Sequence, residues 1–252
     1  MSAAESLPLR LRELKLPSFV AHHTALAQQA EQGGWSFPAY LLELCELELR
    51  ERHERKIERL RRGSQLPPEK TLATLETKRL PAPVRRQLPT LCEGGFLERA
   101  ENLLAFGLPG RGKTHLVCAI GHELVQKGYQ VLFVPTYRLV QRLLAAKREL
   151  ALPAEMRKLD RCDLVILDDL GYVQQDREEM EVLFTFLAER YERRSVAITS
   201  NLVFSEWDRI FKDAMTTAAA IDRLVHHSTI LELTGKSYRS EAAKRRVGES
   251  AQ

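Results

Sequence analysis

The segment Gly107–Thr114 constrains the fold of this chain more than any other feature. It reads Gly-Leu-Pro-Gly-Arg-Gly-Lys-Thr and matches the phosphate-binding loop (P-loop) pattern G-x-x-x-x-G-K-[ST] at every fixed position. Glycines let the backbone approach phosphate oxygens and turn its N–H groups toward them, and a following helix adds its positive end. Apolar residues precede the segment and a helix-compatible run follows it, so the sequence predicts a strand, a phosphate-binding loop and a helix.

The pattern assigns roles within this segment. Lys113 is placed to reach the β- and γ-phosphates of a nucleotide, and the Thr114 hydroxyl is placed to ligate Mg²⁺. The expected cofactors are therefore ATP and Mg²⁺. The predicted nucleotide-binding residues are the loop and the first residues of the helix: Gly107, Leu108, Pro109, Gly110, Arg111, Gly112, Lys113, Thr114 and His115.

A second apolar run ends in two acidic residues, Asp168 and Asp169. Residues 164–167 are Leu-Val-Ile-Leu, which is typical of a parallel strand buried on both faces. Ligands of such sheets lie beyond the carboxyl ends of the strands, so Asp168 is expected to hold Mg²⁺, directly or through water. Asp169 is expected to face the attacking water as its base or positioning residue. A solvated acidic turn is the alternative, and the preceding P-loop makes it the weaker one.

Strand-like and helix-like runs alternate from about residue 90, which predicts βαβ units and a parallel sheet. The expected fold is α/β, a three-layer sandwich around a five-stranded parallel sheet. The predicted strands are 103–106, 131–135, 164–167, 196–200 and 229–233. The predicted helices are 115–127, 136–150, 178–193 and 222–226.

The predicted organisation has four parts. Residues 1–66 form a small all-helical N-terminal domain that binds DNA, a partner protein or both, with helices ending near Pro17 and near Gly33 and a long one running from Pro38 to Arg62. Prolines make residues 67–89 a linker, residues 90–240 form the ATPase domain, and residues 241–252 form a basic tail.

Composition fits a globular protein with a hydrophobic core, since 44% of the 252 residues are hydrophobic and 29% are charged. No run resembles a membrane span or a signal peptide, so we expect a cytoplasmic protein. The net charge is only +4, but residues 50–62 hold seven Lys or Arg against three Glu. Such a cluster suits a polyanion such as DNA, or is a solvated helix face with internal ion pairs.

The chain resembles AAA+ ATPases, and among them the IstB-like transposition helper proteins. The resemblance rests on 100–107 leading into the P-loop, on 163–171, and on the later segments Ile198-Thr199-Ser200-Asn201-Leu202, Asp222-Arg223-Leu224-Val225-His226-His227 and Gly235-Lys236-Ser237-Tyr238-Arg239. It implies that Asn201 orients water against the γ-phosphate, at the position called sensor 1. It also implies that Arg223 is an arginine finger that enters a neighbouring subunit's site, that Arg239 faces nucleotide or DNA, and that the C-terminal lid is short or absent.

What the resemblance implies for function is an ATP-dependent DNA-binding helper ATPase of an insertion-sequence transposase. Such a protein would form a homo-oligomer with shared ATP sites on duplex DNA, largely independent of sequence, and would meet its cognate transposase there. Two alternatives remain open. One is a replicative helicase loader of the DnaC type, and the other is a nucleotide-gated protein-interaction switch with negligible turnover.

Two adjacent histidine pairs, His22-His23 and His226-His227, are interpreted as packing or interface residues. Neighbouring residues of a helix or strand point to different faces, and no Cys, His or acidic cluster accompanies the second pair in the sequence. We therefore expect no metal site beyond that of Mg²⁺.

Overall fold

The computed structural model describes residues 3–171, 177–202, 206–207 and 214–234. The chain divides into two units, Met1–Arg59 and Leu60–Gln252, and each is described separately. No helix of the described ranges is both long enough and apolar enough to span a membrane. Arg239 and the predicted basic tail lie outside the described residues.

The N-terminal unit is helical, as the sequence predicts. It contains α1 (Ala3–Glu13), α2 (Pro17–Gly33) and most of α3 (Phe37–Ser64). Proline fits the first turn of α2, where its missing N–H costs no helical bond, and Gly34 ends that helix in the left-handed conformation. A small core of Leu11, Phe19 and Leu44 joins the three helices.

The buried carboxylate of Glu48 adds a polar tie to this unit. It accepts hydrogen bonds from the backbone N–H of Ser18 (2.8 Å) and from the guanidinium groups of Arg52 (2.9 Å) and Arg55 (3.2 Å). Burial raises the pKa of Glu48, but the bonds from Ser18 and Arg52 more than offset this, and the pKa lies below its usual value. The charged form of Glu48 therefore stabilises the contact between α2 and α3.

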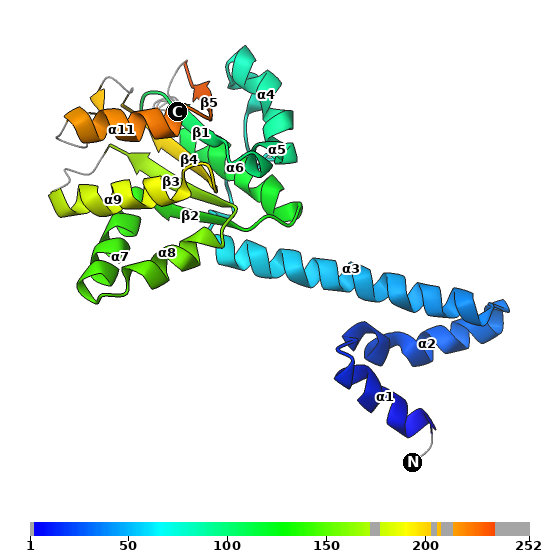
Figure 1. Cartoon of the computed structure of the whole chain (residues 1–252). Helices are drawn as coiled ribbons and strands as arrows, with labels where there is room; N and C mark the ends of the chain where they lie inside the picture. The colour runs from blue at the N-terminus through cyan, green and yellow to red at the C-terminus, as the bar shows by residue number, and fades with distance from the viewer. Residues whose placement is uncertain (1–2, 172–176, 203–205, 208–213, 235–252) are drawn as a thin grey trace, which may run out of the picture. The chain divides into compact units, whose positions relative to one another are not determined.

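The C-terminal unit is a three-layer sandwich around a parallel sheet, which confirms the predicted fold class (Figure 1). The strands are β1 (Asn102–Phe106), β2 (Val131–Pro135), β3 (Leu164–Leu170), β4 (Ser195–Ser200) and β5 (Ser228–Glu232), in the order β2-β3-β4-β1-β5. The helices are α4 (Ala82–Glu93), α5 (Gly95–Glu98), α6 (Lys113–Gln126), α7 (Thr136–Arg148), α8 (Leu152–Asp160), α9 (Arg177–Arg190) and α11 (Ala214–Val225).

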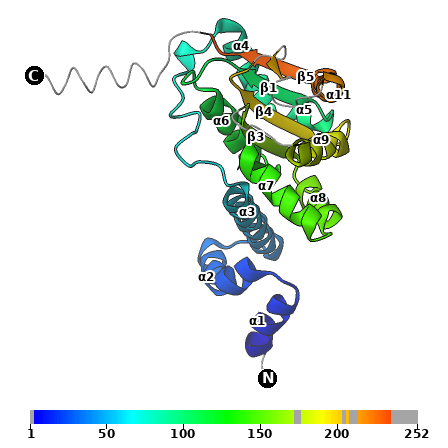
Figure 2. The same cartoon turned by 90° about the vertical axis from the view of Figure 1, so that its left-hand side faces the viewer.

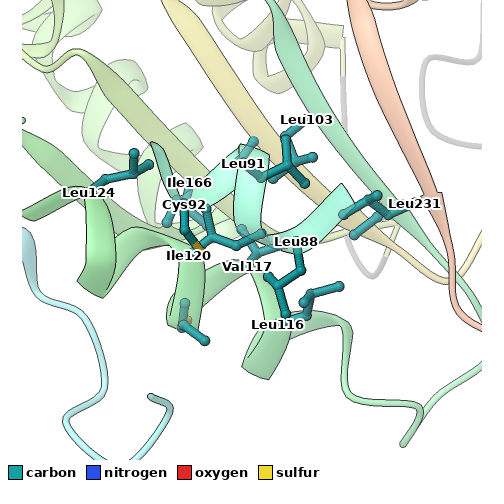
Figure 3. Close-up of a cluster of buried hydrophobic side chains, with 14 of the residues drawn as sticks. Leu88, Leu91, Cys92, Leu103, Leu116, Val117, Ile120, Leu124, Ile166 and Leu231 are labelled. Carbon is teal, nitrogen blue, oxygen red and sulfur yellow. The ribbon is translucent and has the colours of Figure 1, made fainter. Parts of the chain in front are cut away.

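Alternation along the central strands sends side chains into two separate cores. In β1, Leu103 and Ala105 join the cluster under α4 and α6, whereas Leu104 and Phe106 join the cluster under α7, α9 and α11. Figure 3 shows the first cluster, and Figure 2 shows the helices on the two faces of the sheet. Fully burying one such leucine contributes about 1.5–3 kcal/mol, so both layers hold the sheet in place.

Three details differ from the sequence-based expectation. Helix α8 was not predicted, although a proline in its first turn is a favourable helix start. Helix α11 begins at Ala214, eight residues before the predicted start. The stretch expected to be a linker contains the short 3₁₀ helix η1 (Thr77–Arg79) and most of α4. Pro81 is the N-cap of α4, Pro83 lies in its first turn, and the helix also accommodates Pro89 in its interior.

That stretch also packs into the core of the C-terminal unit. Leu75, Leu80, Val84 and Leu88 are all buried in the cluster under α6. The two units divide between Arg59 and Leu60 rather than at residue 66. Residues 67–89 thus belong to the C-terminal unit.

Candidate functional site

The sheet order brings three polar segments to one edge of the sheet. β1 lies next to β4, and β4 lies next to β3, so the ends of these strands are neighbours. The P-loop follows β1, Asp168 and Asp169 lie near the end of β3, and Asn201 follows β4. This is the carboxyl edge of a parallel sheet, where ligands of α/β proteins bind.

The P-loop depends on glycine at both ends. Gly107 has φ of 150°, and a β-carbon there would lie 2.5 Å from the carbonyl oxygen of Leu233. Gly112, with φ of 84°, precedes the first residue of α6. Its carbonyl accepts the first helical hydrogen bond, from Leu116 at 2.9 Å. The loop therefore closes tightly against the residues after β5 and opens directly into the positive end of α6.

Lys113 is buried inside the loop. Its side chain is 6% exposed, and its Nζ donates to the carbonyl oxygens of Gly107 (2.7 Å) and Leu108 (3.2 Å). A buried ammonium group needs such partners, and phosphate oxygens are stronger ones than neutral carbonyls. The side chain is thus positioned for a nucleotide phosphate in the loop.

Asp168 accepts two hydroxyl hydrogen bonds on one carboxylate oxygen. Thr114 Oγ1 and Thr199 Oγ1 each lie 2.7 Å from Asp168 Oδ1. Thr199 Oγ1 also accepts the backbone N–H of Asp169 at 2.9 Å. A threonine hydroxyl and a carboxylate are the oxygen ligands that Mg²⁺ takes, so the predicted pair fits this ion. Mg²⁺ held there would neutralise charge on the phosphates.

Thr199 is a site residue that the sequence analysis did not identify. It belongs to a buried strand, and although its segment carries part of the family resemblance, it was assigned no role in the sequence analysis. The pairing of β3 and β4 shifts between Leu167 and Leu170, so the two aspartates leave the regular ladder beside Thr199. Asp169 has φ of 58°, the left-handed conformation that Asp adopts more readily than most residues. The irregularity explains how one threonine contacts both aspartates.

A cavity of about 300 Å³ lies against the P-loop, and several of the predicted catalytic residues line it. Asp169 and Asn201 line it together with Lys113 and Thr114. Asn201 Oδ1 is buried and makes no hydrogen bond to any described residue. A buried amide oxygen without a partner is costly, so a donor such as water or a bound ligand would stabilise it.

The same cavity is lined by a segment that the sequence analysis took for linker. Lys70, Thr74, Leu75 and Glu76 face it from residues 66–76, which we call the strap. His115 Nε2 lies 3.1 Å from the carbonyl oxygen of Thr71 and 3.1 Å from Thr74 Oγ1.

A second histidine holds the other end of the strap. His122 Nε2 lies 3.0 Å from the carbonyl oxygen of Pro67. His115 and His122 are seven residues apart, so they share one face of α6. This spacing was not used in the sequence analysis, and it does not indicate by itself which segment the two histidines contact.

Three predicted nucleotide contacts line a different cavity. Gly107, Leu108 and Arg111 line a space of about 400 Å³, and Arg111 donates to the carbonyl oxygen of Leu233 at 3.3 Å. None of the three lines the cavity that holds Lys113. Their predicted role in nucleotide binding therefore rests on backbone groups.

Arg223 does not line the cavity of its own chain. It lies near the end of α11, where its guanidinium carbon is 4.9 Å from the centre of the Phe184 ring of α9. Its Nη1 is buried without a hydrogen-bond partner among the described residues. An arginine finger acts in a neighbouring subunit, so this position leaves that prediction untested.

The sheet order, with a P-loop after β1 and an acidic pair on β3, defines an AAA+ type P-loop nucleotide-binding protein. The chain belongs to the family of IstB-like ATP binding proteins, whose model matches residues 9–246. A relative from Sinorhizobium fredii, named as an insertion sequence ATP-binding protein, is 44% identical over 97% of this chain and 84% of its own length. One from Pseudomonas aeruginosa, named for the insertion sequence IS21, is 36% identical over 96% of this chain and 91% of its own length.

Solved structures agree on the fold. The DnaI structure matches 68% of this chain and 96% of its own, with a TM-score of 0.54 and 19% identity. The replication initiator DnaA, bound to AMPPCP and single-stranded DNA, matches 74% of this chain and 56% of its own, with a TM-score of 0.58 and 18% identity. These likenesses confirm the predicted AAA+ architecture.

Proposed function

We propose that this protein is an ATPase that assembles on duplex DNA when ATP is bound and assists an insertion-sequence transposase. The observation that carries the proposal is that Lys113 and Thr114 line one cavity and that Asp168 accepts a hydrogen bond from Thr114 beside it, in a family named for ATP binding. The association with transposition comes from the names of the relatives, which belong to insertion sequences.

In the proposed reaction, Lys113 exchanges its loop carbonyls for the β- and γ-phosphates. Thr114 and Asp168 hold Mg²⁺, which supplies charge neutralisation at the phosphates. Asp169 accepts a proton from the attacking water. Asn201 Oδ1, which has no hydrogen-bond partner among the described residues, accepts a hydrogen bond from that water and so orients it.

Arg223 supplies the intersubunit part of the proposal. In a neighbouring protomer's site, its guanidinium group stabilises the charge of the transferring phosphoryl group. ATP then bridges two protomers, and hydrolysis removes the bridge. This arrangement couples the nucleotide state to assembly of a homo-oligomer.

Duplex DNA is the proposed surface for assembly. Arg50, Lys56 and Arg59 of α3 are exposed and form no ion pair with another described residue. Arg52 and Arg55, by contrast, form ion pairs with Glu48, so their charges are partly neutralised and attract DNA phosphates less strongly. Exposed cations hold phosphates without reading bases and make binding strongly dependent on salt.

The first test measures DNA binding by the full chain with ATP, ADP or no nucleotide, on duplex and single-stranded DNA across a salt series. We expect ATP-dependent duplex binding that weakens steeply with salt and is absent in Lys113→Ala. A preference for single strands would favour a helicase loader. Absence of binding in every nucleotide state would favour the protein-interaction switch.

A mixing experiment tests the shared site. Arg223→Ala is expected to bind ATP but not hydrolyse it, and Lys113→Ala is expected to do neither. In a mixture, a Lys113→Ala protomer supplies Arg223 to the intact pocket of an Arg223→Ala protomer, so part of the turnover should return. Normal hydrolysis by Arg223→Ala alone would refute the intersubunit role.

A further inference from the structure

Three side chains of types that can bind a metal ion lie together just after the ends of α9 and α11, away from the cavity against the P-loop. One carboxylate oxygen of Glu192 and one ring nitrogen each of His226 and His227 lie within 4.8 Å of one another. The two imidazole rings are 4.1 Å apart between centroids, and His227 Nε2 is 3.9 Å from Glu192 Oε1. All three residues are exposed, and none of them lines the ATP cavity.

The local backbone explains why adjacent histidines converge. His226 and His227 lie in the turn between α11 and β5, so the rule that neighbours in a helix or strand face apart does not apply. The backbone carbonyl of His227 accepts the N–H of Asn102 at 2.7 Å, which fixes the turn against the start of β1. The acid missing from the sequence around the pair comes from Glu192, at the end of α9.

A neighbouring side chain that is not itself a candidate ligand orients one of the two imidazole rings. The hydroxyl of Tyr191 lies 3.2 Å from His226 Nδ1. Ligating histidines and carboxylates are commonly oriented by such outer partners.

We propose that Glu192, His226 and His227 bind one Zn²⁺ ion, with water in the fourth position. Two imidazole nitrogens and one carboxylate oxygen are ligands that Zn²⁺ accepts in tetrahedral geometry, whereas Mg²⁺ and Ca²⁺ prefer oxygen alone. The ion would tie the end of α9 to the turn after α11, the helix that carries Arg223. The site is independent of the P-loop chemistry.

The test is isothermal titration of Zn²⁺ into the full chain after chelator treatment, without nucleotide and with a reducing agent because Cys45 is exposed. We expect one site per chain, lost in the double variant His226→Ala/His227→Ala and weakened at least about ten-fold in Glu192→Gln. Co²⁺ in place of Zn²⁺ should give the visible absorption of a tetrahedral site in the unmodified chain and not in the His226→Ala/His227→Ala variant.

The pair His22-His23 provides a matched control. It is also adjacent in sequence and also has a glutamate beside it, since His22 Nε2 lies 3.1 Å from Glu51 Oε1, but His23 Nδ1 contacts the carbonyl oxygen of Phe19. The variant His22→Ala/His23→Ala should keep the Zn²⁺ site. Equal Zn²⁺ binding by the His226/His227 double variant and the unmodified chain, or no Zn²⁺ binding by the unmodified chain, would overturn the proposal.

Discussion

Replacing Thr199 by valine tests how the acidic pair is held. The Thr199 hydroxyl is fully buried, donates to Asp168 Oδ1 at 2.7 Å and accepts the Asp169 N–H at 2.9 Å. Valine fills nearly the same volume but makes neither bond, so the effect is one of hydrogen bonding and not of a cavity.

The magnitude follows from the two bonds. A hydrogen bond to a charged group contributes about 1.5–3 kcal/mol, and leaving a buried N–H unpaired costs about 1–3 kcal/mol. Because both aspartates reach solvent or the cavity, water recovers part of this loss, and we expect a destabilisation of about 2–4 kcal/mol. For a unit of this size, that lowers the melting temperature by about 5–15 °C.

Thermal unfolding of the full chain without nucleotide measures this loss, and Thr199→Ser is the control because it keeps the hydroxyl. The valine variant should also lose Mg²⁺-dependent ATP affinity. If Thr114 turned from Asp168 to a bound Mg²⁺, Thr199 would be left as the hydroxyl that orients the carboxylate. A valine variant that melts within about 2 °C of the unmodified protein and keeps that affinity would refute the argument.

Three other substitutions probe separate parts of the molecule. Gly107→Ala should destabilise the fold by more than about 2 kcal/mol in chemical denaturation, because its β-carbon would meet the Leu233 carbonyl at 2.5 Å. Glu48→Gln should lower the stability of the N-terminal unit. Burial raises the pKa of Glu48, but its bonds from Ser18 and Arg52 lower it further, so the folded pKa lies below the unfolded one. The stabilisation is therefore present above about pH 4.3 and is lost as the pH falls through the folded pKa, which circular dichroism across an acid titration would detect. Lys70→Ala should weaken ATP binding about three- to ten-fold in a fluorescence titration, because it removes a cation that lines the cavity.

The sheet was predictable because its signals are local. Runs such as 164–167 are apolar without interruption, and the described strands begin and end within three residues of the predicted ones. The P-loop and Asp168 carry their chemistry in residue type and spacing. Their convergence with Asn201 follows from the parallel sheet, whose strand ends share one edge.

The missed features depend on contacts between distant segments. Thr199 contacts the two aspartates because of a register shift between strands, and no sequence pattern marks that shift. The strap was predicted to be a linker because its prolines disfavour regular structure. Leu66 and Leu75 are nevertheless buried, and two histidines of α6 contact its backbone carbonyls. Glu192 and the His226-His227 pair are more than thirty residues apart in sequence and meet only where two helices end.

Hydrogen bonding divides the candidate site residues into two groups, those with partners in the chain and those without. Lys113 and Asp168 already have partners within the chain, which hold them ready for phosphate and metal ion. Asn201 Oδ1 and Arg223 Nη1 are buried without partners among the described residues. Each costs about 1–3 kcal/mol while unpaired. We infer that bound nucleotide, for Asn201, and a neighbouring protomer, for Arg223, would recover this cost, so that ligand binding and assembly favour each other.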